Sequence, residues 1–243
     1  MILRTLIAAL PLAITWLHAV AEEQGSVLIA TKSHSLFEDD FQRDSIGEWK
    51  VVIPGFQVAD GVLIGTQERK DHGAVGRVYL PMQDVIVSFR FRLTAFTRFN
   101  VVFDDKNHKG SHAGHICRIA VSPQQIRLGD DKEGIMRNDI FAMRRDPKQK
   151  LAAEKLLKGR SVASKVLIEP KQWYTMQVEI VGQQMCVSLD GQPVACLQSP
   201  GIAHPSKESL HFTVTGQPVH FDDVKILQAV PTGRIRGSIT WDR

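Results

Sequence analysis

Residues 85–93 read Val85-Ile86-Val87-Ser88-Phe89-Arg90-Phe91-Arg92-Leu93, and from Val85 onward every second side chain is apolar. Successive side chains of an extended strand point to opposite faces, so these alternate apolar residues share one face. Ser88, Arg90 and Arg92 share the other face. The pattern predicts a strand in a sheet that buries one face and exposes the other.

The same alternation recurs along the chain between short groups of turn residues. Residues 174–180 place Tyr174, Met176, Val178 and Ile180 on one face. Further strands are expected near residues 56–58, 62–66, 75–79, 99–103, 115–121, 125–128, 164–168, 185–189, 193–197, 210–215 and 219–228. Short strands at such intervals, without alternating helices, predict an all-β fold of two packed antiparallel sheets.

Only Lys148–Lys158 has a helical pattern of any length, so one short inserted helix is expected. From Arg144 to Arg160, seven Lys or Arg residues stand against only Asp146 and Glu154, whereas the whole chain has a net charge of +4. This helix could be a basic arm for nucleic acid or another anionic surface, or a solvated helix whose leucines cover a sheet edge. No aromatic residues interleave the charges, so we expect no nucleic-acid partner.

The first 21 residues have the build of a secretory signal peptide. Arg4 precedes an apolar run at residues 6–17, and Ala19-Val20-Ala21 offers a cleavage site. The alternative is a membrane anchor, but the run is shorter than the roughly 20 apolar residues that a spanning helix needs. We therefore expect cleavage after Ala21 and a secreted or periplasmic protein without stable membrane insertion. The expected organisation is a signal peptide at 1–21, one domain at 22–230 and a C-terminal tail at 231–243.

The three cysteines, Cys117, Cys186 and Cys196, could form a disulfide in an exported protein. Cys186 and Cys196 flank the turn Asp190-Gly191, and a three-residue hairpin loop at 190–192 would place them opposite each other. Asp-Gly favours the two-residue turn, which would not do so. We therefore expect three buried thiols.

Several short segments together form a recognisable pattern. They are Leu36-Phe37-Glu38-Asp39-Asp40-Phe41, Gly47-Glu48-Trp49, Phe56-Gln57-Val58-Ala59-Asp60-Gly61-Val62-Leu63, Trp173, Leu189-Asp190-Gly191-Gln192-Pro193-Val194 and Phe221-Asp222-Asp223-Val224-Lys225-Ile226. The pattern resembles the 3-keto-disaccharide hydrolase domain family and, more broadly, the concanavalin A-like lectin and glucanase superfamily. This resemblance covers nearly the whole chain after the signal peptide. It implies a jelly-roll β-sandwich that holds sugar on the concave face of a curved sheet, and activity on glycosides oxidised at C3.

The Glu-x-Asp-x-Glu strand that supplies nucleophile and acid in family 16 glycoside hydrolases is absent from the sequence. Without two carboxyl groups a few ångströms apart, an ordinary retaining mechanism lacks its parts. A 3-keto sugar demands less, because its ketone acidifies the neighbouring C2 proton. One base and one enolate stabiliser then permit elimination of the glycosidic oxygen, followed by addition of water.

The densest polar cluster, residues 104–115, lies between two expected strands. Three histidines fall within eight residues of this loop, beside two aspartates. Such side chains bind transition metals, and an imidazole is also a general base near neutral pH. For a 3-keto sugar, His112 or His115 would be the base, and Arg118, a nearby arginine or a metal would stabilise the enolate. In the alternative interpretation, the histidines cap strand ends or contact sugar hydroxyls.

Charged residues around this cluster are candidates for sugar binding, because loops after consecutive strands can meet at one end of a sandwich and guanidinium groups suit bidentate recognition. The candidate substrate-binding residues are Arg90, Arg92, Asp104, Asp105, His108, Asp130, Asp131, Arg137 and His204. The alternatives are exposed strand residues paired with acids, and a polar turn at residues 130–139.

Asp39 and Asp40 near the start, and Asp222 and Asp223 near the end, form a candidate metal site. First and last strands of such sandwiches often lie side by side, so these acids could share a structural calcium ion. Otherwise they cap turns or pair with Lys225. A divalent metal, calcium or a transition metal, stays open as a cofactor, and none is required.

The sequence thus predicts an exported carbohydrate-active protein, a hydrolase or lyase of 3-keto-disaccharides or related glycosides. The alternative is a non-catalytic, lectin-like carbohydrate-binding module, and a third is an extracellular adhesion or scaffold protein. The expected partner of the first two is a carbohydrate.

Overall fold

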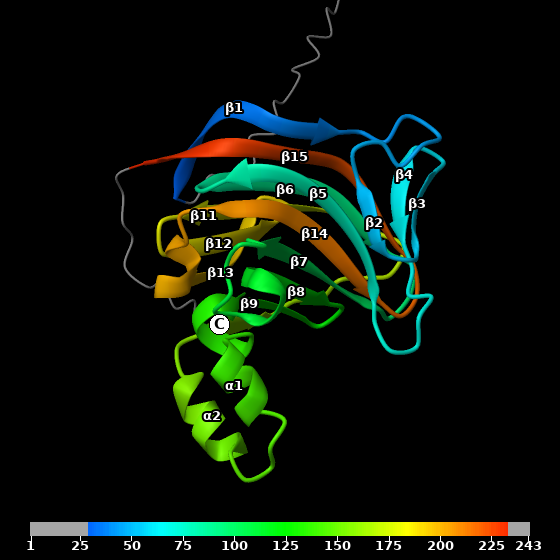
Figure 1. Cartoon of the computed structure of the whole chain (residues 1–243). Coiled ribbons are helices and arrows are strands. Elements are labelled where there is room, and N and C mark those ends of the chain that lie inside the picture. The colour runs from blue at the N-terminus through cyan, green and yellow to red at the C-terminus, as the bar shows by residue number, and fades with distance from the viewer. Residues whose placement is uncertain (1–28, 233–243) are drawn as a thin grey trace, which may run out of the picture.

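Two antiparallel sheets packed face to face form the part of the chain that the computed structural model describes, residues 29–232 (Figure 1). Sheet A contains, in order, β13 (Gln192–Gln198), β12 (Gln184–Leu189), β11 (Trp173–Val181), β6 (Val85–Leu93), β15 (Val219–Pro231), β4 (Val62–Gly65) and β3 (Phe56–Ala59), and β1 (Ala30–Asp39) pairs with β15. Sheet B contains, in order, β10 (Ser161–Lys165), β9 (Gln125–Asp130), β8 (His115–Ser122), β7 (Arg98–Asp104), β14 (Lys207–Thr215), β5 (Ala74–Met82) and β2 (Lys50–Ile53). The predicted all-β antiparallel sandwich is confirmed.

Strand β6 buries the face that its alternation predicts. Its inward residues, each at most 1% exposed, are Val85, Val87, Phe89, Phe91 and Leu93. Phe89 packs against Phe212 of β14 and Phe221 of β15, with ring centroids 5.1 Å and 6.3 Å away. Side chains of both sheets therefore share one core, whose apolar burial holds the sheets face to face.

Two long connections leave sheet B at the same end. The loop at residues 105–114 joins β7 to β8 and ends in the short helix η1 (His112–Gly114). The helical insert, residues 131–160, joins β9 to β10 and contains η2 (Asp131–Ile135), α1 (Asn138–Met143) and α2 (Lys150–Leu156). The two connections meet, because the backbone N–H of His112 donates to Met136 and that of Asn138 donates to Gly110. Beyond this junction the insert projects away from the sheets (Figure 1).

The expectation of a single helix at Lys148–Lys158 is wrong in part, because α1 precedes α2 within the insert. Helix α1 is short and buries only Ile140, so it has no apolar period that a sequence pattern could reveal. Leu151 and Leu156 of the second helix are 74% and 45% exposed, so they do not cover a sheet edge.

A disulfide joins Cys186 to Cys196, which overturns the expectation of three buried thiols. The turn at Asp190-Gly191 is the two-residue turn that these residues favour, with φ values of 47° and 74°. The ladder then shifts register by one residue at Val194. This bulge brings the two cysteines opposite each other, with Cα atoms 4.1 Å apart. Cys117 is a buried free thiol, as expected.

Strands β1 and β2 were not expected, and the strand expected at residues 164–168 lies at Ser161–Lys165 instead. The predicted signal peptide, residues 1–21, and the predicted tail beyond Thr232 lie outside the described residues. Within residues 29–232, no helix is long and apolar enough to cross a membrane.

Candidate functional site

Polar side chains gather on the outer face of sheet B, which is turned away from the core. A row of directly paired residues crosses this face in the order Arg77, His211, Val102, Arg118 and Gly129. Residues that pair directly across neighbouring strands share a face of the sheet. The row therefore places two arginines and a histidine from three strands on one surface, with small side chains between them.

Asp104 lies at the centre of this surface and is 2% exposed. Its Oδ1 lies 2.6 Å from Nδ1 of His115. Its Oδ2 lies 2.8 Å from Nη2 of Arg77 and 3.0 Å from Nδ1 of His211. Side chains from three strands, β5, β8 and β14, thus converge on the carboxylate that β7 supplies.

A β-bulge brings His115 to this surface. Strand β8 pairs Cys117 with Phe103, but the next pair joins His115 to Asp104, which leaves Ile116 as an extra residue. A bulge shifts the alternation of the residues beyond it. Ile116 is therefore buried in the core, and His115 faces outward beside Asp104.

The ionisation states follow from burial and contact. Burial opposes ionisation of Asp104, but the hydrogen bonds with His115 and His211 outweigh it and hold the pKa of Asp104 below its usual range. Burial also lowers the pKa of His211, and this effect exceeds the opposite effect of the carboxylate. At neutral pH the centre is therefore a carboxylate beside a neutral His211.

Arg118 and Asp131 form a buried ion pair on the same face, with Nε 2.5 Å from Oδ2. Burial raises the pKa of Asp131, and the contact with Arg118 offsets only part of this effect. Within the described part of the chain, Nη2 of Arg118 and Oδ1 of Asp131 are buried without a hydrogen-bond partner. An unpaired buried polar group costs about 1–3 kcal/mol. Arg118 therefore holds a buried N–H donor whose hydrogen bond is unsatisfied within the described residues.

His112 lies at the rim of this surface and is stacked on Phe141 of α1, with ring centroids 4.3 Å apart. The guanidinium of Arg145 also lies over Phe141, 4.1 Å from the ring centroid. The rings of His112 and His115 are 6.3 Å apart. Burial, followed by the charges of His115, Arg145 and Arg118, lowers the pKa of His112. The insert therefore holds a neutral imidazole beside the centre.

Asp104, His115 and His211 also have the donor set of a metal site. One ligand atom from each lies within 4.8 Å of the others, and two imidazoles with a carboxylate suit a transition metal. Arg77 contacts only Oδ2 of the carboxylate. The arrangement fits a hydrogen-bonded acid–base centre as it stands, and the same three side chains offer ligand atoms to a transition metal.

Asp105, His204 and Asp130, all predicted to bind substrate, hold loops together in the structure. Nε2 of His204 lies 2.8 Å from Oδ2 of Asp105, and the ring of His108 lies 5.1 Å from that of His204. Asp130 accepts hydrogen bonds from Ser199 and from the backbone of Gly201. The histidines of the loop therefore divide, with His112 and His115 at the outer face of sheet B and His108 beside His204.

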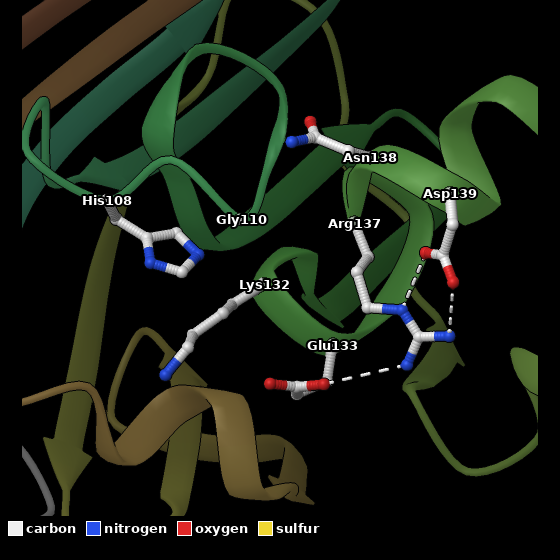
Figure 2. Close-up of a pocket in the computed structure, with 7 residues that line it drawn as sticks. All are labelled: His108, Gly110, Lys132, Glu133, Arg137, Asn138 and Asp139. Atoms are coloured by element: carbon white, nitrogen blue, oxygen red, sulfur yellow. Dashed lines mark hydrogen bonds and ion pairs between the residues drawn. The ribbon is translucent and has the colours of Figure 1, made fainter.

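A hollow of about 350 Å³ lies between the β7–β8 loop and the insert (Figure 2). His108 and Lys132 line it from one side. On the other side Arg137 donates to Asp139 from Nε and Nη2, and its Nη1 lies 3.6 Å from Glu133. Arg137, a predicted binding residue, is thus already held by two carboxylates.

Arg90 and Arg92 lie on the outer face of sheet A, so they cannot share a ligand with Arg118 across the core. Each guanidinium lies 4.9 Å from the ring centroid of Trp173. Arg92 also contacts Nδ1 of His220 at 2.7 Å. The predicted substrate-binding residues Arg90 and Arg92 and the predicted catalytic residue Arg118 therefore lie on opposite outer faces, because alternation shows which residues face outward but not from which sheet.

The metal site predicted at Asp39, Asp40, Asp222 and Asp223 does not match the structure, although β1 and β15 do lie side by side. The oxygens of Asp39 accept hydrogen bonds from Arg43, from Nε1 of Trp49 and from a backbone N–H. Nη1 of Arg90 lies 3.4 Å from Asp222 and 3.3 Å from Asp223. The carboxylates of Asp39, Asp222 and Asp223 are therefore already paired with arginines and hydrogen-bond donors, which a calcium ion would have to displace.

Sequence reasoning missed Arg77 and His211. Both occupy polar positions of alternating strands, since His211 stands between Leu210 and Phe212 and Arg77 stands before Val78. That signal shows that they point away from the core. Their approach to Asp104 depends on the order β7-β14-β5, which alternation does not reveal.

The two antiparallel sheets define a jelly-roll-like β-sandwich. The chain belongs to the 3-keto-alpha-glucoside-1,2-lyase-like domain family, whose profile matches residues 32–227. The family resemblance of the sequence is thereby confirmed. No curated protein matches this chain.

Solved structures share the fold at low identity. SCLam, a non-specific endo-beta-1,3(4)-glucanase from family GH16, is 10% identical with a TM-score of 0.55, covering 86% of this chain and 98% of that chain. The carbohydrate binding module CBM66 from Bacillus subtilis is 11% identical with a TM-score of 0.52, covering 74% of this chain and 96% of that chain. The Crh5 transglycosylase is 11% identical with a TM-score of 0.54, covering 86% and 91%. Identities this low show the fold alone.

Proposed function

We propose that this protein is a lyase or hydrolase of 3-keto-glycosides, with His115 as the base and Asp104 as the residue that orients it. The contact of 2.6 Å between His115 Nδ1 and Asp104 Oδ1 carries the proposal. A carboxylate bound at Nδ1 holds the imidazole proton there and leaves a lone pair on Nε2. The His115 side chain is 16% exposed, so a substrate on the outer face of sheet B can approach it.

The elimination needs one proton transfer in each direction, and the later addition of water needs a second pair. Nε2 of His115 takes the acidic C2 proton, and the electron pair forms an enolate on the C3 oxygen. Collapse of the enolate forms a C1=C2 double bond as the C1–O bond breaks, and the leaving oxygen takes the proton from the imidazolium. Addition of water at C1, with a proton returned to C2, completes hydrolysis. Release of the unsaturated sugar before this addition is the lyase outcome.

Arg118 supports the first step as the enolate stabiliser. Its Nε is fixed by Asp131, while Nη2 is buried without a partner among the described residues. A preorganised donor at the developing negative charge stabilises the transition state. The neutral His112 at the rim is a second group that can carry a proton.

The carboxylates of this face do not favour an ordinary glycosidase. Asp104 is held by His115, His211 and Arg77, and Asp131 is held by Arg118. A retaining mechanism needs one carboxylate free to attack C1 and another free to donate a proton. Elimination from a 3-keto sugar needs neither.

Sugar binding without turnover is the second candidate function. The fold likeness to the carbohydrate-binding module CBM66 favours it. One experiment separates the enzyme from the binding module. The purified protein is incubated with a 3-keto-disaccharide and with the unmodified disaccharide, each with and without chelator. Monosaccharide or unsaturated sugar formed only from the keto substrate supports the enzyme. Binding of either sugar without product supports the carbohydrate-binding module. Loss of activity on addition of chelator would indicate a metal held by Asp104, His115 and His211.

We also propose that the protein acts outside the cytoplasm, secreted or periplasmic. The Cys186–Cys196 disulfide supports this, because such bonds persist in oxidising compartments. Cell fractionation with N-terminal sequencing is the measurement. We expect Glu22 as the first residue of the exported protein, and a cytoplasmic chain that still begins at Met1 would contradict the proposal.

A further inference from the structure

The helical insert holds a group of cations that no acid neutralises. They are Arg144, Arg145, Lys148, Lys150, Lys155, Lys158 and Arg160. Within residues 29–232 none of them forms an ion pair, whereas Arg69, Arg77 and Arg118 each contact a carboxylate. The rest of the chain is near neutral, so its positive charge is concentrated in this segment.

Helix α2 presents leucines between these charges. Its buried side is marked by Ala153, which is fully buried. At 100° per residue, Leu151, Lys155, Ala152 and Leu156, all exposed, span an arc of about 140° on one side of the helix, and Leu156 lies about 60° from Ala153. The two leucines are 74% and 45% exposed. Exposed leucines cost free energy in water, and an apolar partner that covered them would remove this cost.

The insert projects away from both sheets, so a large flat partner can reach it without touching the sandwich (Figure 1). Its root supplies Phe141, which stacks on His112 at the rim of the candidate site. A partner bound to α2 would therefore lie close to the site without covering it.

We propose that α2 and its flanking basic residues dock the protein on an anionic lipid bilayer. Phospholipid headgroups supply the negative charge, and the boundary between headgroups and acyl chains accepts Leu151 and Leu156. A soluble polyanion, such as nucleic acid or an acidic glycan, would pair with the lysines but offers nothing to the leucines. This is peripheral binding by one face of a short helix, and it does not depend on the proposed chemistry.

Vesicle co-sedimentation tests the proposal with the chain that begins at Glu22, which retains every described residue. The probes are vesicles of phosphatidylcholine alone and of phosphatidylcholine with phosphatidylglycerol. The variants are Lys148→Glu with Lys155→Glu, and Leu151→Ser with Leu156→Ser. Lys32→Glu with Lys70→Glu is the matched control, because it changes the charge equally at exposed positions outside the insert. Thermal unfolding of each variant checks that the fold is intact.

We expect the unaltered protein to bind only the anionic vesicles and to dissociate in high salt. The lysine variant should bind about ten-fold or more weakly, since each basic residue near the surface adds to the attraction. The leucine variant should bind several-fold more weakly, while the control binds normally. The proposal would be overturned if the control variant lost as much vesicle binding as the lysine variant, or if the leucine variant bound normally. Either result would mean that nonspecific charge alone explains the binding. Absence of binding to anionic vesicles would overturn the proposal directly.

Discussion

At the scale of single residues, Asp104 explains why His115 can act as a base. The carboxylate contacts two imidazoles and a guanidinium, and these partners keep it ionised despite burial. Ionised Asp104 then fixes the His115 proton on Nδ1. Asp104 never touches the reacting atoms in this mechanism, so it is a positioning residue.

Replacement of Asp104 by Asn tests that role. The amide has nearly the same shape, but it can present its NH₂ group to Nδ1 and so favour the wrong tautomer of His115. We expect kcat for a 3-keto-disaccharide to fall by about 10²–10⁴-fold with little change in KM. A loss confined to KM would show that Asp104 binds substrate instead.

Asp105 gives a prediction for pH. Burial opposes its ionisation, but hydrogen bonds from His204, Ser206 and the backbone of Asn107 lower its pKa from 3.8 to about 2. Because the folded pKa is the lower one, this stabilisation is complete above the unfolded pKa and is lost as pH falls towards about 2. Urea unfolding should show Asp105→Asn less stable than the unaltered protein at pH 6. The difference should shrink below pH 4, and a difference that is constant with pH would be inconsistent with the shifted pKa.

At the scale of elements, two β-bulges decide features that alternation alone could not predict. The bulge at Val194 places Cys186 opposite Cys196, and the bulge at Ile116 turns His115 towards Asp104. The strands themselves were predictable, because period-two alternation reports burial directly. A bulge adds one residue without changing the composition of the strand, so the residues around it predicted free thiols where the structure has a disulfide.

The disulfide should stabilise the hairpin of β12 and β13. Its cysteines are separated by 10 residues, and a loop of that size gives about 3 kcal/mol in the chain-entropy account. We expect Cys186→Ser with Cys196→Ser to lower the free energy of unfolding by roughly this amount. Reductant should lower the stability of the unaltered protein similarly and leave the double variant unchanged. If reductant also lowered the stability of the double variant, the effect of reductant would not come from the Cys186–Cys196 disulfide.

At the scale of the whole molecule, the sequence predicted two sheets and an apolar core, but not which strands are neighbours. Alternation placed Arg90, Arg92 and Arg118 correctly on outer faces. The strand order places Arg90 and Arg92 in one sheet and Arg118 in the other. It also brings His211 and Arg77 next to Asp104. Contacts between residues far apart in sequence depend on this order, so Arg77 and His211 were not accessible from the sequence. The rest of the candidate site was, namely Asp104, His112, His115, Arg118 and Asp131.

The shared core predicts that the sandwich unfolds as one unit. Phe89 contacts aromatic rings from both sheets, so Phe89→Ala should cost about 3–5 kcal/mol. Near-UV and far-UV circular dichroism should report a single coincident transition at a lower temperature. Separate transitions for the two probes would indicate that the sheets fold independently.

Removal of the C2 proton by His115 is the central claim, and turnover in D₂O tests it most directly. If a 3-keto-disaccharide is cleaved in D₂O, the account predicts one deuterium at C2 of the released keto sugar when hydrolysis is complete, and no product from His115→Asn. Nuclear magnetic resonance of the product measures this, with spontaneous exchange subtracted in a sample without protein. Product that keeps its original C2 hydrogen would contradict the account, because direct displacement at C1 would then be the reaction.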